Sequence, residues 1–205
     1  RGAGTTPDEW NLFHVQARIA GALGDDGLRR KVGRFVSGDR VDDVIDAYRR
    51  ALPSADSDGL LSAAMTDMVF RHPAIRLAEA QLAHTGEVAM YRFDQPSTAM
   101  GGVLGACHAI EVPFVFDNLD RGGVDVLLGG LDDDTLRLGS RTAAAWAAMA
   151  HAGAPATDAL ALAPTAPGSD SAAAANRSTR RPRGRVNAGA TRPRTGRCWS
   201  TTKCR

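Results

Sequence analysis

The spacing of apolar residues predicts a largely helical first three quarters of the chain, with few strands. Apolar positions recur at helical spacing in residues 6–23, 40–53 and 58–86, and Pro73 interrupts the last stretch. Residues 132–152 have an acidic start, an Ala-rich middle and a closing Gly153, which predict the strongest helix. Residues 87–94 predict a parallel strand, the last or nearly the last of its sheet, on which helix 132–152 packs. The apolar residues 112–116 predict a buried strand, so the pattern indicates an α/β fold.

Residues 156–205 have a different composition from residues 1–155. The tail holds ten basic and two acidic residues, a balance of +8, whereas the body holds fifteen basic and twenty-one acidic residues, a balance of −6. Few large apolar side chains occur in the tail, so it cannot bury enough surface to offset its ordering entropy. We therefore predict a folded domain over residues 1–155 and a mostly disordered, low-complexity tail over residues 156–205.

Two origins for the tail stay open. Twenty-three of the twenty-five basic residues are Arg, and this composition favours a reading-frame shift near residue 155. A genuine basic tail that binds nucleic acid or acidic surfaces is the alternative. Because no nucleic-acid-binding motif accompanies the tail, we do not expect a nucleic-acid partner.

Several protein classes find no support in the sequence. No stretch of about eighteen apolar residues occurs, so we expect no membrane span. The three cysteines, Cys107, Cys198 and Cys204, lack the spacing of a disulfide framework or a zinc site. Phosphate-binding glycine motifs are absent, and we expect neither a cofactor nor a metal. The sequence begins with Arg1, which leaves a cytoplasmic or a secreted location open.

One histidine has surroundings that suit chemistry. His108 follows a loop that contains Gly101, Gly102 and Gly105, and glycines allow the tight turns that hold a side chain at a pocket. An isolated histidine at the edge of a strand is more often structural than catalytic. An imidazole titrates near neutral pH, however, and it can act as a general base where a suitable acid orients it.

Residues around His108 resemble the histidine region of type-B carboxylesterases, the family of para-nitrobenzyl esterases and cholinesterases. The family pattern Gly-x-x-His-x-x-Glu-x-x-(Phe/Tyr)-Val-Phe is matched by Gly105, His108, Glu111, Phe114, Val115 and Phe116. Residues 4–13 resemble a second family segment, Gly-x-x-x-Asp-Glu-x-x-x-Phe. Residues 70–81 and 143–155 show weaker likenesses to family segments, and all of these segments occur in the same order as in the family. The resemblance covers residues 2–155 and implies the C-terminal part of an α/β-hydrolase domain.

The resemblance implies a role for two residues. Glu9 matches the triad acid and His108 the triad base, in the order acid then histidine that α/β-hydrolases follow. Asp8 is a rival acid through its position beside Glu9, and we expect Glu111 to make a structural polar contact. Trp10 and Phe13 could line a pocket, although core packing is the more common role for such residues.

The sequence lacks the third member of a triad. None of its ten serines lies in the Gly-x-Ser-x-Gly pattern of a nucleophile elbow. The resemblance therefore implies a serine esterase for small carboxylic esters whose nucleophile and oxyanion hole lie in a missing N-terminal portion of the same domain. Such a fragment is expected to be inactive alone. The alternatives are a non-catalytic relative of the adhesion type and a nucleic-acid binder that acts through its basic tail.

Overall fold

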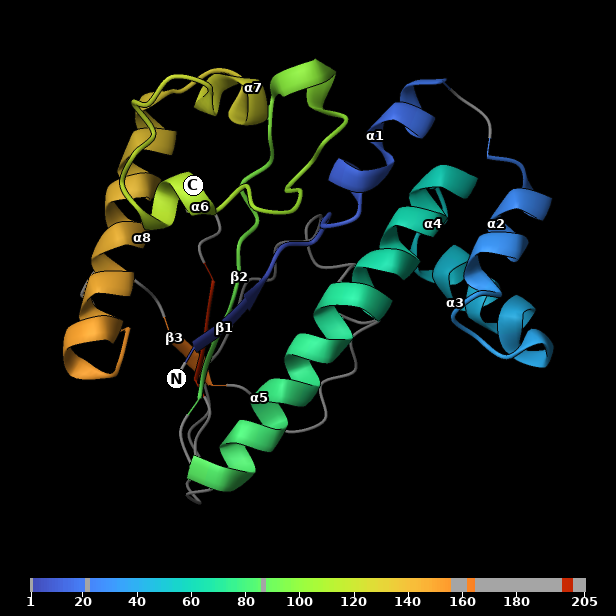
Figure 1. The fold of residues 1–205 in the computed structure, drawn as a ribbon, viewed down its shortest axis with the longest axis horizontal. Helices are drawn as coiled ribbons and strands as arrows, with labels where there is room; N and C mark the ends of the chain where they lie inside the picture. The colour runs from blue at the N-terminus through green and yellow to red at the C-terminus, as the bar shows by residue number, and fades with distance from the viewer. Residues whose placement is uncertain (1, 21–22, 86–87, 156–161, 165–196, 201–205) are drawn as a thin grey trace, which may run out of the picture.

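The computed structural model describes residues 2–20, 23–85, 88–155, 162–164 and 197–200. Helices dominate, and Figure 1 shows the short strands between two groups of helices. The α-helices are α1 (Asn11–Ala20), α2 (Asp25–Val32), α3 (Val41–Ala51), α4 (Ser57–Thr66), α5 (His72–Thr85), α6 (Val112–Val115), α7 (Val124–Leu128) and α8 (Asp133–Ala152). Two 3-10 segments, Gly38–Arg40 and Ala99–Gly102, and a π-helical turn, Asp67–Arg71, complete the helical structure of the described residues.

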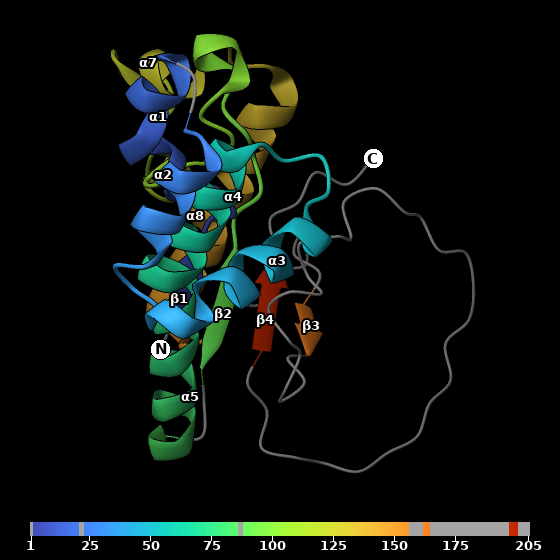
Figure 2. The same cartoon turned by 90° about the vertical axis from the view of Figure 1, so that its right-hand side faces the viewer.

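The strands form a small sheet in the order β1-β2-β4-β3. They are β1 (Gly2–Thr5), β2 (Ala89–Arg92), β3 (Leu162–Pro164) and β4 (Arg197–Ser200). The pairs β1–β2 and β2–β4 are parallel, whereas β3 and β4 are antiparallel. Figures 1 and 2 show α5 and α8 on opposite sides of β1 and β2. The sheet therefore lies between these two helices, and the loops after β1 and β2 leave it at the same end.

Two apolar clusters hold the described residues together. The first surrounds β2 and the loop before α6, and it is closed by α8, with Phe93, Phe114 and Ile110 fully buried. The second lies among α2, α3 and α4 and contains Leu28, Val32, Ile45 and Leu61. The end of the loop after β1 and the start of α1 lie between the clusters, because Trp10 packs against the second and Leu12 of α1 packs against the first.

Several elements confirm the sequence patterns. Helices α3, α5 and α8 and strand β2 fall within the segments predicted for them, and α4 begins one residue before its segment, at Ser57. Asp132 caps α8 by accepting the Thr135 N–H at 2.8 Å, and Gly153 ends the helix in a left-handed conformation at φ 72°. Helix α8 packs on the sheet as expected, since Trp146 contacts Tyr91 edge to face at a centroid distance of 5.7 Å. Helix α1 begins later than predicted, at Asn11, because the residues before it form the loop after β1.

The apolar run at residues 112–116 is a correction to the sequence prediction. It forms the short helix α6 instead of a buried strand. Pro113 lies in the first turn, where its missing N–H costs nothing, whereas within a strand ladder it would remove a hydrogen bond. Only Pro113 and Phe114 of this helix are buried. His108 consequently lies in a turn that leads into a helix, not at the edge of a strand.

The prediction of a mostly disordered tail concerns residues that lie largely outside the described part of the chain. Residues 162–164 and 197–200 are described, as β3 and β4.

Candidate active site

Glu9 and His108 form a hydrogen-bonded pair across 99 residues of sequence. Oε2 of Glu9 lies 2.6 Å from Nδ1 of His108. The other carboxylate oxygen, Oε1, accepts the Thr6 backbone N–H at 2.8 Å. The Glu9 side chain is only 7% exposed, so it is largely shielded from water. Both of its oxygens have hydrogen-bond partners, as buried carboxylates require. The acid is therefore fixed, and it in turn fixes the orientation of the imidazole.

The His108 side chain is open to the surface despite this buried partner. It is 43% exposed, and Nε2 makes no hydrogen bond with the described residues. Because Glu9 binds Nδ1, the favoured neutral tautomer carries its proton on Nδ1 and presents Nε2 as an acceptor. The pair can therefore remove a proton from a group that approaches Nε2.

The backbone around His108 is a series of tight turns. Gly105 has φ of +57°, and Ala109 directly after the histidine has φ of +64°. The Ile110 N–H donates to the Cys107 carbonyl at 3.2 Å, which closes a turn around His108. A left-handed conformation at a non-glycine residue such as Ala109 is uncommon and is held only where the surrounding structure fixes it.

Two phenylalanines lie against the imidazole. Ring centroids of Phe70 and Phe13 are 4.9 Å and 5.3 Å from that of His108, and the two phenyl rings stack on each other at 5.8 Å. Phe13 is 55% exposed, so it forms part of the surface beside the histidine. The core-packing expectation is thus correct for Trp10, which packs against the helical cluster, and wrong for Phe13.

Phe70 carries no signal in the sequence that could have assigned it to this site. It belongs to the π-helical turn Asp67–Arg71, which joins α4 to α5. A π turn has no distinct pattern of apolar residues, and such turns are frequent at functional sites. The expectation of an interruption near Pro73 found the approximate place but not its geometry.

Asp8 binds the backbone before His108, whereas a rival acid would bond the imidazole. Oδ2 of Asp8 accepts the Ala106 N–H at 2.9 Å, while its own N–H donates to the Ala106 carbonyl at 3.1 Å. The carboxylate bonded to His108 is therefore that of Glu9, and Asp8 holds the backbone of the preceding loop.

Glu111 lies close to this pair but does not share its hydrogen bonds. Burial raises the pKa of Glu111, and the negative charge of Glu9 raises it further, whereas its own backbone amide and His108 lower it. Oε2 of Glu111 is buried and has no hydrogen-bond partner among the described residues. The expected structural polar contact is therefore not seen at this oxygen.

Cys107, directly before His108, does not have the properties of a nucleophile. Its side chain is fully buried, and burial raises the pKa of the thiol to about 11. A reactive cysteine requires an accessible thiol with a lowered pKa. Cys107 instead packs in the apolar cluster around β2.

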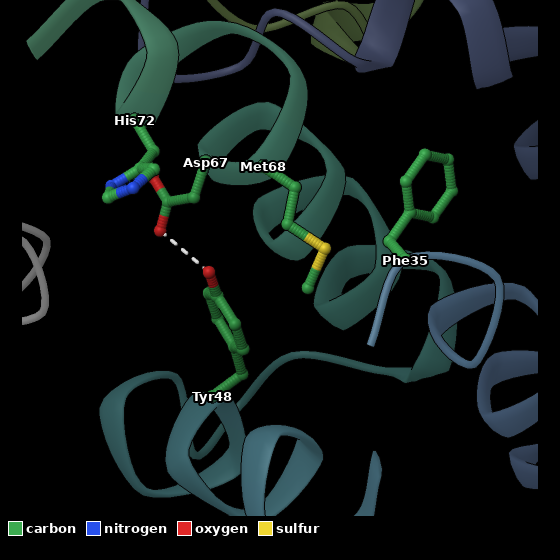
Figure 3. A pocket seen from close by; sticks show the side chains of 5 residues that line it. All are labelled: Phe35, Tyr48, Asp67, Met68 and His72. Carbon is green, nitrogen blue, oxygen red and sulfur yellow. Dashed lines mark hydrogen bonds between the residues drawn. The ribbon is translucent and has the colours of Figure 1, made fainter. Parts of the chain in front are cut away.

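A separate pocket of about 340 Å³ lies between α3 and the turn that joins α4 to α5. Figure 3 shows the residues that line it: Phe35, Tyr48, Asp67, Met68 and His72. The Tyr48 hydroxyl donates to Oδ2 of Asp67 at 2.8 Å, and burial raises the pKa of Tyr48. Asp67 and Met68 belong to the same π turn as Phe70, so this turn contributes to the pocket and to the surroundings of His108.

Within the described residues, no group of three or more His, Cys, Asp or Glu side chains is placed to hold a metal ion. None of the described helices combines the length and the apolar character that crossing a membrane requires.

A mainly parallel sheet flanked by helices, with a histidine–glutamate pair on the loops beyond it, is the arrangement of part of an α/β-hydrolase domain. No family model matches the chain. It is 34% identical over 165 residues to a para-nitrobenzyl esterase of Bacillus subtilis (strain 168), a match that covers 77% of this chain and 30% of the relative. It is also 38% identical over 100 residues to a phenmedipham hydrolase of Pseudarthrobacter oxydans, covering 48% of this chain and 20% of that relative.

Solved structures give the same relationship. A carboxylesterase of Geobacillus stearothermophilus matches with a TM-score of 0.61 and 32% identity, over 77% of this chain and 32% of the other. A PNB esterase matches with a TM-score of 0.57 and 28% identity, over 77% of this chain and 30% of the other. The chain belongs to the type-B carboxylesterase family, and it spans about a third or less of the length of these relatives.

Proposed function

We propose that this chain supplies the acid and the base of a serine carboxylesterase, with Glu9 as the acid and His108 as the base. The observation that carries the proposal is the 2.6 Å contact between Glu9 Oε2 and His108 Nδ1. It joins the two residues that the family resemblance selects independently of any structure. The relatives named above are all esterases or hydrolases, which supports ester hydrolysis over the adhesion and nucleic-acid alternatives.

In this proposal the nucleophile is a serine from a part of the esterase domain that this chain does not contain. His108 Nε2 takes the proton of the serine hydroxyl as its oxygen attacks the ester carbonyl carbon. The imidazolium then protonates the departing alkoxide, and the carbon–oxygen bond of the ester breaks to leave an acyl-enzyme. Water, activated by the same nitrogen, releases the acid and restores the serine. Glu9 holds the imidazole tautomer and stabilises the positive charge that forms on it.

The surroundings of Nε2 support an uncharged small-molecule ester as the substrate. Phe13 and Phe70 provide an apolar surface beside the imidazole, and Phe13 is exposed where a substrate would arrive. No charged side chain is bonded at Nε2 in the described part of the chain. Burying an ester against this surface removes apolar area from water.

The test is hydrolysis of a p-nitrophenyl ester by this chain combined with the N-terminal portion of the domain. His108→Ala should lower kcat by at least about 10³-fold, because the serine loses its base. His84→Ala, which removes an exposed histidine near the end of α5, is the matched control and should leave kcat unchanged. Near-normal turnover by the His108 variant would end the assignment.

A further inference from the structure

Two hydrogen bonds of opposite direction join Asp8 to Ala106. The Asp8 N–H donates to the Ala106 carbonyl at 3.1 Å, and the Ala106 N–H donates to Asp8 Oδ2 at 2.9 Å. Both polar backbone groups of Ala106 are thus bound by a single residue. Asp8 directly precedes Glu9, and Ala106 lies two residues before His108. The two bonds therefore act between the loop that carries the acid and the loop that carries the base.

The close approach of the two loops depends on Gly105. A Cβ at this position would stand 2.4 Å from Asp8 Oδ2, so the carboxylate occupies the space that any other residue would need. Gly105 also has φ of +57°, which glycine adopts without strain. Its carbonyl accepts the Ser97 N–H at 2.8 Å, which holds the loop from its other side.

A third hydrogen bond joins the same two segments. The Asn11 side-chain Nδ2 donates to the Leu104 carbonyl at 3.1 Å. Asn11 is buried and begins α1, so it ties the histidine loop to the first residue of that helix. Residues 104–106 are therefore hydrogen-bonded to Asp8, Asn11 and Ser97, of which Asp8 and Asn11 lie on either side of Glu9 in the sequence.

We propose that Asp8 is a positioning residue that clamps the histidine loop onto the acid loop and thereby sets the geometry of the Glu9–His108 pair. This inference rests on the proposed function, since the pair must act on a serine for its geometry to affect turnover. In it, the Asp8 carboxylate serves as a fixed hydrogen-bond acceptor and exchanges no proton with His108. Displacing a catalytic group by about 1 Å can cost about 10²-fold in rate, so loss of the clamp should be visible in kcat.

Two substitutions distinguish the role of Asp8 as a hydrogen-bond acceptor from the role of its negative charge. Asp8→Ala removes both, whereas Asp8→Asn keeps one side-chain oxygen that can accept the Ala106 N–H. In the esterase assay with the N-terminal portion present, Asp8→Ala should lower kcat by about 10²-fold with little change in KM. Asp8→Asn should stay within about threefold of the unsubstituted protein, by retaining the acceptor. Asp39→Ala, an exposed acid at the start of a 3-10 turn, is the control for loss of one negative charge.

The pH profile of kcat/KM is a second measurement. A smaller amount of folded protein would lower kcat/KM at every pH but would not shift the profile along the pH axis. Both Asp8 variants lack the charge, whereas Glu9, which bonds His108, and Glu111, whose charge interacts with His108, are unchanged in both. Only Asp8→Ala should loosen the contact that stabilises the imidazolium. The acid limb of the profile should therefore lie at lower pH in Asp8→Ala than in Asp8→Asn. Equal kcat losses in the two variants would assign the effect to charge and overturn the clamp.

Hydrogen exchange of the Ala106 amide gives a third readout, which needs no activity. The amide should exchange faster in Asp8→Ala than in Asp8→Asn, as followed by mass spectrometry of a peptide containing residues 104–108. Unchanged protection in Asp8→Ala would overturn the clamp. If the unsubstituted protein hydrolyses no ester, the proposed function fails, and the exchange rates still decide whether Asp8 holds the loop.

Discussion

Gly4 and Tyr91 face each other on the paired strands β1 and β2, and the tyrosine ring fills the space beside the glycine. The two residues are register partners in the parallel pair. A Cβ on Gly4 would stand 2.0 Å from Cζ of Tyr91, far closer than two carbon atoms can approach. Tyr91 is buried and meets Trp146 of α8 on the sheet, so its ring has little freedom to move aside. The glycine in the strand before the acid loop is therefore required by packing.

Replacing Gly4 by alanine should destabilise the fold. Gly4→Ala forces the Tyr91 ring out of its position, and overpacking of this kind costs about 1–3 kcal/mol of unfolding free energy. Urea unfolding at low protein concentration, followed by tryptophan fluorescence, measures the change. Gly122→Ala, at a site with no heavy atom within 4 Å of the added Cβ, is the control and should stay within about 0.5 kcal/mol. An equal effect of both substitutions would contradict the packing argument.

Replacing Glu9 by glutamine should lower turnover while leaving the loops in place. The amide retains the size of the carboxylate but cannot stabilise the imidazolium, and it favours the wrong tautomer of His108. We expect kcat for p-nitrophenyl ester hydrolysis to fall by about 10²–10⁴-fold, with KM changed little. The assay uses the chain combined with the N-terminal portion. A variant with unchanged kcat would remove Glu9 from the proposed mechanism.

Replacing Glu111 by glutamine should stabilise the protein in a pH-dependent way. Burial raises the pKa of Glu111 above its ordinary value of 4.5, so ionisation is less favourable in the folded than in the unfolded state. Below about pH 4.5 the group is protonated in both states, and its contribution to stability is fully present. That contribution is lost as pH rises through the folded-state pKa. The glutamine variant should thus be more stable than the parent at pH 7.5, with the difference fading toward pH 4.

Urea midpoints at the two pH values measure this effect. Glu79→Gln, at an exposed position in α5, is the matched control and should show no such pH dependence. A Glu111→Gln variant that is less stable at pH 7.5 than at pH 4, relative to the parent, would show that the ionised carboxylate is favoured in the folded state.

The isolated chain should show no esterase activity above background. It holds the proposed base and its acid, but none of its ten serines lies in a nucleophile-elbow pattern. It should also bind hydrophobic dyes and associate, because Phe116 and Val126 are 71% and 73% exposed and β1 lies at an edge of the sheet. Ester hydrolysis, dye fluorescence and light scattering test these points. Stoichiometric labelling of the chain alone by a fluorophosphonate, with turnover, would show that the nucleophile lies within it.

The sequence predicted most of the helices, because their apolar spacing and end signals agree with their packing. It misassigned residues 112–116, since a short apolar run has no period of its own and Pro113 suits a first helical turn. The pairing of Glu9 with His108 came from motif resemblance, because no local pattern reports a contact across 99 residues. The role of Asp8 was also hidden, because proximity in sequence to Glu9 suggested a second acid, whereas its side chain points to the Ala106 amide.

The π turn Asp67–Arg71 makes the surroundings of His108 sensitive to chain length. A π turn contains one residue more per turn than an α-helix, so deleting a single residue there could convert it to regular α-helix. Because the π turn accommodates the extra residue, the deletion would leave α4 and α5 in roughly their present relative directions and would change only the turn itself. Asp67, Met68 and Phe70 belong to this turn, so their side chains would be redirected while the neighbouring helices stay in place. A one-codon deletion in this segment is thus a way to alter the apolar surface beside His108 that leaves Glu9 and His108 intact.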